Sequence, residues 1–331
     1  MPRIFLTHEP DMLKNYYGER AVAGLRKSGE IVINPTGRVL DGPSLIEAAR
    51  GCEIIVSDRQ TAGPREIFEK SPDLVAFLRC AVDIRNIDVA AANKAGVLVT
   101  QATPGFAASV SEMAIGYMID LGRRITGSVI QYRQGREADV HMGNQLNGAT
   151  LGIIGYGVIG EYLAPLGVAL GMTVLVADPF KKVETPGVRQ VDQDTLLRDS
   201  DYVVCLVVAT NETENLMNAD VFAAMKPSAF FINMSRGNLV DEAALARALD
   251  KKQIAGAAMD VGRAQDQRPS LALASRRDVI ATPHTAGATP QSVEHQAFDT
   301  VRQVAELVAG RIPVGAVNTA QAMRMERLRK G

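Results

Sequence analysis

The stretch at residues 150–171, TLGIIGYGVIGEYLAPLGVALG, decides the fold of this chain. Three of its glycines, Gly155, Gly157 and Gly160, have the spacing G-x-G-x-x-G, directly after the apolar run 150–154 and before a run with leucines on one helical face. In that context the first glycine permits a tight turn, the second lets the backbone approach a phosphate, and the helix N-terminus offers N–H donors. The sequence therefore predicts a strand, a phosphate-binding loop and a helix in succession.

An acid in the expected place indicates which phosphate compound this loop binds. Asp178 ends the next apolar run, 173–178, and lies 23 positions after Gly155. A carboxylate there can accept hydrogen bonds from both hydroxyls of an adenosine ribose, and it would repel a 2′-phosphate. The combination predicts a dinucleotide cofactor and favours NAD over NADP.

The same alternation of short apolar runs and helical patterns continues on both sides of this loop. Apolar runs typical of buried parallel strands occur at 3–7, 30–34, 53–57, 74–80 and 96–100, and again at 173–178, 201–208, 229–234, 255–260 and 278–283. Amphipathic patterns predict long helices at about 107–125 and 290–309. The sequence therefore predicts an α/β fold with parallel sheets.

Composition limits the class of protein further. The 331 residues suffice for two domains of ~150 residues each. The 36 Lys and Arg residues nearly balance the 37 Asp and Glu residues, so the net charge of −1 favours neither nucleic acid nor an anionic membrane as a partner. No run of ~20 apolar residues predicts a membrane span. Cys52, Cys80 and Cys205 lie in apolar runs without metal spacing, which predicts reduced thiols in a cytoplasmic protein and no metal site.

Several long motifs, in order, give the chain a resemblance to the D-2-hydroxyacid dehydrogenase family, which includes phosphoglycerate, glyoxylate and formate dehydrogenases. The motifs are FINMSRGNLVDEAALARAL at 231–249, IAGAAMDV at 254–261 and TPHTAG at 282–287. The resemblance covers nearly the whole chain. It implies two Rossmann-like or flavodoxin-like α/β domains with an active-site cleft between them. The expected substrate-binding domain is 1–101 plus 290–331, the expected NAD-binding domain is 102–289, and the resemblance implies a homodimer through the latter.

Two residues of these motifs are the expected catalysts. Arg236 and His284 both follow apolar runs, at the carboxyl edge of the predicted sheet where ligands bind. By the resemblance, the guanidinium of Arg236 holds a carboxylate and polarises the adjacent carbonyl, and His284 exchanges the proton. Of the other histidines, we expect His8 to be a surface residue and His295 to belong to the last helix.

The partner of His284 departs from the family pattern. A glutamate usually pairs with this histidine, but its place, five residues after Asp260, holds Gln265. A carboxylate would stabilise a charged imidazolium, whereas a neutral amide orients the ring without supplying charge. Three alternatives remain open: Asp266 reaches His284 through a shifted loop, Gln265 and His284 form a neutral pair as in formate dehydrogenase, or the protein binds NAD as a sensor without turnover.

The expected substrate-binding residues also depart from the family. Ala81, Val82 and Asp83 occupy the loop whose backbone N–H groups usually bind the substrate carboxylate. Phe106 replaces a common asparagine and predicts a more apolar wall, and Arg59 is a candidate for a distal anionic group. No named substrate can be transferred to this chain from its sequence.

The resemblance completes the expected cofactor site. Asp260 is expected to bind the nicotinamide carboxamide, and Val207 to lie beside the adenine. The full expected set is Gly155, Tyr156, Gly157, Val158, Ile159, Gly160, Asp178, Val207, Thr213, Met234, Ser235, Asp260, Ala286 and Gly287.

Together these features predict an NAD-dependent oxidoreductase with a small-molecule substrate, which interconverts a 2-hydroxy acid and its 2-oxo acid. Two alternatives remain: an NAD(H)-binding sensor that resembles the corepressors of this family, and hydride transfer of the formate dehydrogenase type. Phe106, in place of the usual asparagine, counts against the second of these.

Overall fold

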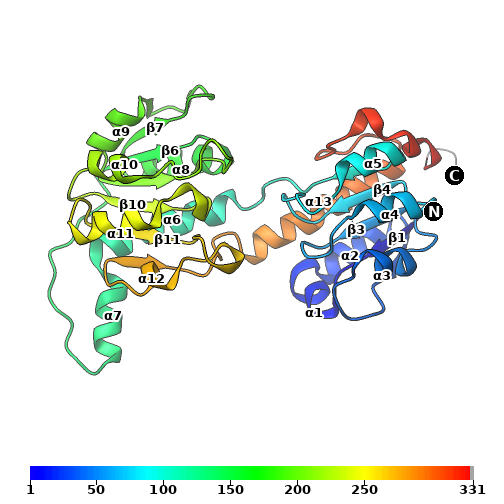
Figure 1. Ribbon diagram of the computed structural model, residues 1–331, viewed down its shortest axis with the longest axis horizontal. Coiled ribbons are helices and arrows are strands. Elements are labelled where there is room, and N and C mark those ends of the chain that lie inside the picture. Colours follow the sequence, from blue (N-terminus) through cyan, green and yellow to red (C-terminus); the bar gives the residue numbers. More distant parts are fainter. Residues whose placement is uncertain (329–331) are drawn as a thin grey trace. The chain divides into compact units, whose positions relative to one another are not determined.

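The computed structural model describes residues 1–328, which form two compact units. The first unit contains Met1–Gly105 together with the chain from Pro290 onward, and the second contains Phe106–Thr289. Each unit is a parallel sheet covered by helices (Figure 1), which confirms the predicted α/β class.

The first unit is built on five parallel strands in the order β2-β1-β3-β4-β5. They are β1 (Arg3–Leu6), β2 (Glu30–Ile33), β3 (Ile54–Ser57), β4 (Ala76–Arg79) and β5 (Leu98–Thr100). Its helices are α1 (Pro10–Met12), α2 (Glu19–Arg26), α3 (Gly42–Ala48), α4 (Arg65–Lys70), α5 (Val89–Ala95) and α13 (Pro290–Val308).

Alternating strand residues supply two apolar layers in this unit. Leu6 and Val56 face one side of the sheet, where Leu25 of α2 and Leu307 of α13 cover them. The next residues along, such as Phe5 and Phe77, face α3, α4 and α5 on the other side. Burial on both faces explains why these strands are continuous apolar runs in the sequence.

The second unit is a seven-stranded parallel sheet in the order β12-β11-β10-β9-β6-β7-β8. Its strands are β6 (Thr150–Ile154), β7 (Thr173–Ala177), β8 (Val188–Gln190), β9 (Tyr202–Cys205), β10 (Phe230–Asn233), β11 (Gly256–Met259) and β12 (Val279–Ala281). Its helices are α6 (Ala107–Arg123), α7 (Ile125–Arg133), α8 (Val158–Ala169), α9 (Gln193–Asp199), α10 (Ala219–Ala224), α11 (Glu242–Asp250) and α12 (Leu271–Ala274).

Helices α6 and α8 cover one face of this sheet, and α9 to α12 cover the other. The predicted helix at 107–125 is α6, which ends at Arg123 because Arg124 has left-handed backbone angles (φ 53°) that turn the chain into α7. Helix α6 buries Ala114 and Met118 against Leu163 of α8, as its apolar stripe predicts.

Strand register brings the expected site residues to one edge of this sheet. Asn233, the last residue of β10, pairs with Met259 of β11, which in turn pairs with Ala281 of β12. The loops that follow these three strands therefore begin at the same level, on neighbouring strands. The loops after β6, β7 and β9 leave the same carboxyl edge, because every strand of the sheet is parallel.

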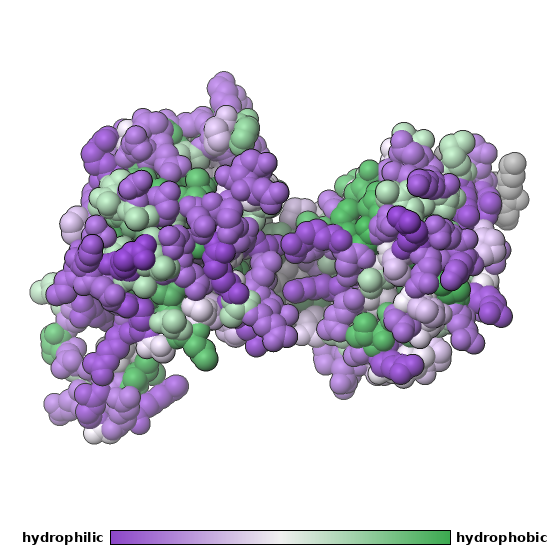
Figure 2. All heavy atoms as spheres, in the orientation of Figure 1, coloured by the Kyte–Doolittle hydropathy of each residue, from purple (hydrophilic) through white to green (hydrophobic). Residues whose placement is uncertain are grey.

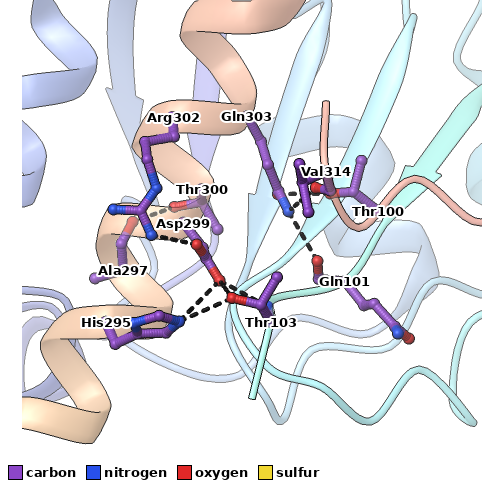
Figure 3. A network of polar contacts seen from close by, with 10 residues as sticks. All are labelled: Thr100, Gln101, Thr103, His295, Ala297, Asp299, Thr300, Arg302, Gln303 and Val314. Atoms are coloured by element: carbon purple, nitrogen blue, oxygen red, sulfur yellow. Dashed lines mark hydrogen bonds and ion pairs between the residues drawn. The ribbon is translucent and has the colours of Figure 1, made fainter. Parts of the chain in front are cut away.

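A polar network in the first unit joins the segment before α6 to helix α13 (Figure 3). The carboxylate of Asp299 accepts hydrogen bonds from the backbone N–H of Thr103, at 2.6 Å, and from its hydroxyl. His295 lies 2.8 Å from the same hydroxyl, and Arg302 forms an ion pair with Asp299. These bonds explain why residues 102–105 belong to the first unit, four residues beyond the predicted boundary at 101.

Among residues 1–328, no helix is both long enough and apolar enough to cross a bilayer.

Candidate active site

The three glycines after β6 have the geometry of a phosphate-binding loop. Gly155 has φ +94°, and a Cβ on it would lie 2.9 Å from the carbonyl carbon of Leu206. A Cβ on Gly160 would lie 2.7 Å from the carbonyl oxygen of Gly155. A Cβ on Gly157, in contrast, would have no other part of residues 1–328 within 4 Å, so that side of the loop is open to a ligand.

The first turn of α8 provides the donors of this loop. The helix begins at Val158 and has no side-chain cap, so its first N–H groups are not used by a capping side chain. An uncapped helix start behind an open glycine loop fits the pyrophosphate of a dinucleotide. Val158 is exposed and Ile159 half-buried, whereas the ring of Tyr156 is buried and its hydroxyl contacts that of Thr185.

Asp178 follows β7 and is hydrogen-bonded to the glycine loop. Its Oδ2 accepts from the backbone N–H of Tyr156 at 2.7 Å, and its Oδ1 accepts from the N–H groups of Phe180 and Lys181. Burial alone would raise the pKa of Asp178, but these three bonds and the charge of Lys181 together lower it. The group is therefore a stable carboxylate, and Oδ2 retains a lone pair for a ribose hydroxyl.

Arg236 is presented by a tight turn after β10. The side chain of the fully buried Asn233 accepts from the N–H of Ser235 at 3.1 Å and donates to the carbonyl of Arg236 at 3.0 Å. The guanidinium of Arg236 donates to the carbonyl of Ser235 and is half-buried. The hydroxyl of Ser235 donates to the carbonyl of Val207, which joins this turn to the loop after β9.

His284 follows β12 and has left-handed backbone angles, with φ 60°. For a residue with a Cβ this conformation costs roughly 1–2 kcal/mol. Its Nδ1 lies 2.9 Å from the main-chain carbonyl oxygen of Asp266. Because a carbonyl only accepts, Nδ1 carries the proton in neutral His284, and Nε2 is the nitrogen with a lone pair.

The loop at 263–268 explains why a carbonyl is the partner of His284. Asp266 and Gln267 have φ 56° and φ 57°, two consecutive left-handed residues inside the turn Gln265–Gln267. This backbone directs the Asp266 carbonyl to the histidine. In residues 1–328 no hydrogen bond joins the side chain of Gln265 to His284, and no ion pair joins the carboxylate of Asp266 to it.

The carboxylate of Asp260, directly after β11, is hydrogen-bonded to the turn that carries His284. Its Oδ1 accepts from the N–H of Thr285 at 2.8 Å and from the hydroxyl of Thr282, and its Oδ2 accepts from the N–H of Ala286 at 2.9 Å. The side chain is 2% exposed. The carboxylate expected to bind the nicotinamide carboxamide therefore already supports the turn that carries His284, with one lone pair on Oδ2 to spare.

The remaining expected cofactor residues lie along the same edge. Met234 and Ala286 are buried, Gly287 lies beside Phe106, and Thr213 donates its hydroxyl to the carbonyl of Val208. Two exposed apolar side chains on the loops after β7 and β9 were not in the predicted set: Phe180, 98% exposed and two positions after Asp178, and Val208, 75% exposed. The sequence signal that could have identified Phe180 is an apolar residue two positions after Asp178.

The expected substrate loop belongs to the first unit, after β4. Ala81 is buried and accepts from the N–H of Ala102, and Val82 is half-buried. The exposed carboxylate of Asp83 forms an ion pair with Arg85 at 2.6 Å. The charge of Asp83 is thus neutralised by an arginine of its own loop.

The other two expected substrate residues lie in different units. Arg59 is exposed after β3, in the first unit. Phe106 precedes α6 in the second unit and packs against Gly287, where a Cβ would lie 3.4 Å from the Cβ of Phe106. Phe106 therefore forms an apolar wall beside the His284 turn.

A buried polar cluster at the carboxyl edge of the first sheet was not predicted. His8 is 2% exposed, so its assignment to the surface was wrong: the ring packs 4.7 Å from that of Tyr17 and near Asp58 and Arg79. Burial lowers the pKa of His8 to about 4, although Asp58 opposes this. Arg79 is fully buried and donates to the carbonyl of Asp58 and the side chain of Asn86, so it joins β3 to the end of the substrate loop.

Within residues 1–328, no group of three or more His, Cys, Asp or Glu side chains has the arrangement of a metal site.

Comparisons with known proteins agree with this geometry. Residues 115–286 match the family model of the D-isomer specific 2-hydroxyacid dehydrogenase NAD binding domain. The chain is 33% identical to (S)-sulfolactate dehydrogenase of Chromohalobacter salexigens, over 88% of this chain and 96% of that one. It is 34% identical to D-3-phosphoglycerate dehydrogenase of Archaeoglobus fulgidus, over 91% of this chain and 57% of that one. The solved D-lactate dehydrogenase of Lactobacillus jensenii superposes with a TM-score of 0.82 at 26% identity, covering 95% of this chain and 99% of that one.

The chain therefore belongs to the D-isomer specific 2-hydroxyacid dehydrogenase family, and its second unit contains the NAD-binding domain. Several curated relatives are longer proteins: the chain spans about half the length of the phosphoglycerate dehydrogenases that it matches, 51% and 57% in two cases.

Proposed function

We propose that the protein is an NAD-dependent 2-hydroxyacid dehydrogenase, which converts a 2-oxo acid, NADH and a proton to the 2-hydroxy acid and NAD⁺, and the reverse. The observation that carries this proposal is the placement of Arg236 and His284 after β10 and β12, at the sheet edge that also holds the glycine loop. Two strand spacings of ~4.8 Å separate the ends of β10 and β12, a distance that side chains on the two loops can bridge to one small substrate.

The proposed roles follow from the chemistry of the side chains. Arg236 binds the substrate carboxylate through its guanidinium and polarises the adjacent carbonyl. Nε2 of His284 donates a proton to the oxygen in reduction and accepts it in oxidation, while the Asp266 carbonyl keeps the proton on Nδ1. When bound, NAD(H) supplies or accepts the hydride at the substrate carbon.

The chain's own residues fit this cofactor. The glycine loop and the uncapped start of α8 would hold the pyrophosphate, and Asp178 would hold the adenosine ribose. In the first unit, we propose that the backbone of Ala81, Val82 and Asp83 binds a substrate carboxylate. The ion pair between Asp83 and Arg85 supports this, because it offsets the negative charge that would otherwise repel an acid.

Relatives favour turnover over the alternative of an NAD(H) sensor. Similar proteins include a D-3-phosphoglycerate dehydrogenase, an (S)-sulfolactate dehydrogenase and a glyoxylate reductase. Retention of both Arg236 and His284 supports the same choice, since a sensor requires neither a proton donor nor a carboxylate-binding cation.

The test is NADH oxidation against a panel of 2-oxo acids, with His284→Ala as control. The panel contains glyoxylate, hydroxypyruvate, pyruvate, sulfonate- and phosphate-bearing acids, and bulky aromatic and branched acids. We expect turnover of at least one acid by the wild type and its loss in the variant. Tight NADH binding without turnover of any acid would favour the sensor.

We also propose that the protein is a homodimer through its second unit. Helix α7 buries none of its residues, and it protrudes from the unit together with the loop that follows (Figure 1). Apolar side chains lie exposed along this protrusion (Figure 2), namely Ile125, Val129, Ile130, Tyr132, Val140 and Met142. A cavity of about 700 Å³ lies beside residues 141–145. Exposed apolar surface of this kind marks an interaction site.

The homodimer is tested by light scattering after size-exclusion chromatography. The double variant Val140→Glu, Met142→Glu should be a monomer, and Val314→Glu, which changes a similarly exposed apolar residue of the first unit, should remain a dimer. A wild-type monomer would refute the proposal.

We further propose a cytoplasmic location, supported by Cys52, Cys80 and Cys205 being free thiols.

A further inference from the structure

A chain of three side chains connects helix α6 to the turn that carries His284. The hydroxyl of Tyr117, in the middle of α6, is hydrogen-bonded to the hydroxyl of Thr282, directly after β12. The hydroxyl of Thr282 is in turn hydrogen-bonded to Oδ1 of Asp260, directly after β11. Tyr117 and Asp260 are 5% and 2% exposed, and Thr282 between them is half-buried.

The donor and acceptor properties of the three side chains fix the direction of both hydrogen bonds. A carboxylate can only accept, so the single proton of the Thr282 hydroxyl points to Asp260. The oxygen of Thr282 must then accept from Tyr117, whose hydroxyl is the donor. Burial raises the pKa of Tyr117, and the nearby charge of Asp260 adds to this, so the phenol keeps its proton.

Asp260, the last of the three hydrogen-bonded side chains, determines the shape of the His284 turn. Asp260 accepts from the N–H groups of Thr285 and Ala286, the two residues after His284. The N–H of His284 itself donates to the carbonyl of Thr282 at 3.0 Å. The left-handed conformation of His284 is thus bounded on both sides by groups that Thr282 and Asp260 hold in place.

We propose that Tyr117 is a positioning residue for the reaction: through Thr282 and Asp260 it holds the turn that directs the reacting nitrogen of His284. Tyr117 touches neither His284 nor, by this proposal, substrate or cofactor. The effect of Tyr117 is transmitted entirely by the two hydrogen bonds. This positioning role rests on the proposed function of His284 as proton donor.

The variant Tyr117→Phe tests the proposal, because it removes the hydroxyl and leaves the ring in its apolar layer. We expect kcat to fall about 10-fold, less than the ~100-fold that a 1 Å misplacement of a reacting group can cost. The KM for the 2-oxo acid and the Kd for NADH should change less than about twofold, because neither binding step uses the hydroxyl. An unchanged kcat would overturn the proposal.

A double-mutant cycle separates positioning from general loosening of the core. Thr282→Val interrupts the same chain, so the double variant with Tyr117→Phe should be no slower than Thr282→Val alone. Thr282→Ser keeps the hydroxyl and should restore most of kcat. Met118→Leu changes the next, fully buried residue of α6 and should leave kcat unchanged at a similar cost in melting temperature. Independent, multiplicative effects of Tyr117→Phe and Thr282→Val would overturn the proposal.

A readout that needs no turnover distinguishes this proposal from the proposed function. In ¹⁵N-histidine-labelled protein, neutral His284 should be the Nδ1-protonated tautomer in the wild type and a mixture of tautomers in Tyr117→Phe. If no 2-oxo acid is reduced but this change occurs, the proposed function fails and the positioning role stands. An identical tautomer in both proteins would overturn the positioning role.

Discussion

The Nδ1 atom of His284 lies 2.9 Å from the main-chain carbonyl oxygen of Asp266, and no carboxylate in the described part of the chain forms an ion pair with the ring. The hydrogen bond fixes the tautomer as a carboxylate would, but it adds only a dipole and not a full negative charge. It also makes the site depend on backbone conformation at Asp266 and Gln267, both left-handed, rather than on the identity of either side chain.

The first prediction concerns these neighbours of His284. His284→Ala should lower kcat by ~10²–10⁴, the usual contribution of a positioned acid or base. Asp266→Asn and Gln265→Ala should each change kcat less than about threefold, because the histidine bonds to the backbone of this loop and not to either side chain. Asp266→Gly tolerates the left-handed angles and should remain active, whereas Asp266→Pro cannot adopt φ 56° and should behave like His284→Ala.

Steady-state kinetics with the best 2-oxo acid of the panel measures these variants. A loss in Asp266→Asn as large as that in His284→Ala would show that the carboxylate is the partner in the working enzyme. A large loss in Gln265→Ala alone would instead support the neutral pair of the formate dehydrogenase type.

Arg236 gives the second prediction. Arg236→Lys keeps the charge but loses the planar fork that binds a carboxylate through two donors. Loss of one charge-assisted hydrogen bond, worth about 1.5–3 kcal/mol, should reduce kcat/KM by roughly 10- to 100-fold. Kinetics with the same acid measures it, and Arg189→Lys, an exposed arginine on β8, is the control that should stay within twofold or so. Equal kcat/KM for wild type and Arg236→Lys would remove Arg236 from the site.

Asp178 gives the third prediction. Asp178→Ser removes the charge that opposes a 2′-phosphate, so the ratio of kcat/KM for NADPH to that for NADH should rise about 10-fold or more. Part of the change will be weaker NADH binding, because Oδ2 also supports the glycine loop through Tyr156. Asp194→Ser, an exposed acid in the first turn of α9, should leave the ratio unchanged. An unaltered ratio in Asp178→Ser would mean that another group selects the cofactor.

The NAD half of the site could be predicted from sequence because its signals are local. The spacing of Gly155, Gly157 and Gly160 and the position of Asp178 after the next strand are properties of one βαβ unit, and the structure gives each the expected geometry. Arg236 and His284 were placed by a rule of parallel sheets, that ligand-binding residues follow the strands.

What the sequence could not predict depends on backbone angles or on contacts between distant segments. Nothing in the letters of 263–268 indicates that Asp266 has a positive φ, so only the structure shows its carbonyl at His284. Tyr117 lies 165 positions before Thr282, and the amphipathic pattern at 107–125 predicted a helix but no partner for the hydroxyl of Tyr117. His8 was misplaced because its burial follows from tertiary packing: its ring lies against that of Tyr17, and Arg79, on the distant strand β4, is near it.

The buried His8 gives the last prediction, on stability against pH. Its pKa is about 4 in the folded protein, against 6.5 for a free histidine, and the groups around it are Asp58, Arg79 and the Tyr17 ring. Between these two pH values the unfolded chain binds a proton that the folded chain does not, so stability falls as the pH is lowered from 6.5 to 4. The full loss is about 3 kcal/mol, since each pH unit of difference between the two pKa values is worth ~1.4 kcal/mol.

The variant His8→Phe keeps a ring against Tyr17 and removes the titration, so its urea midpoint should decrease less than that of the wild type over this range. His141→Gln, at an exposed histidine, should follow the wild type. Parallel curves for wild type and His8→Phe would show that His8 does not titrate in this window, and acid sensitivity would then rest on the carboxylates.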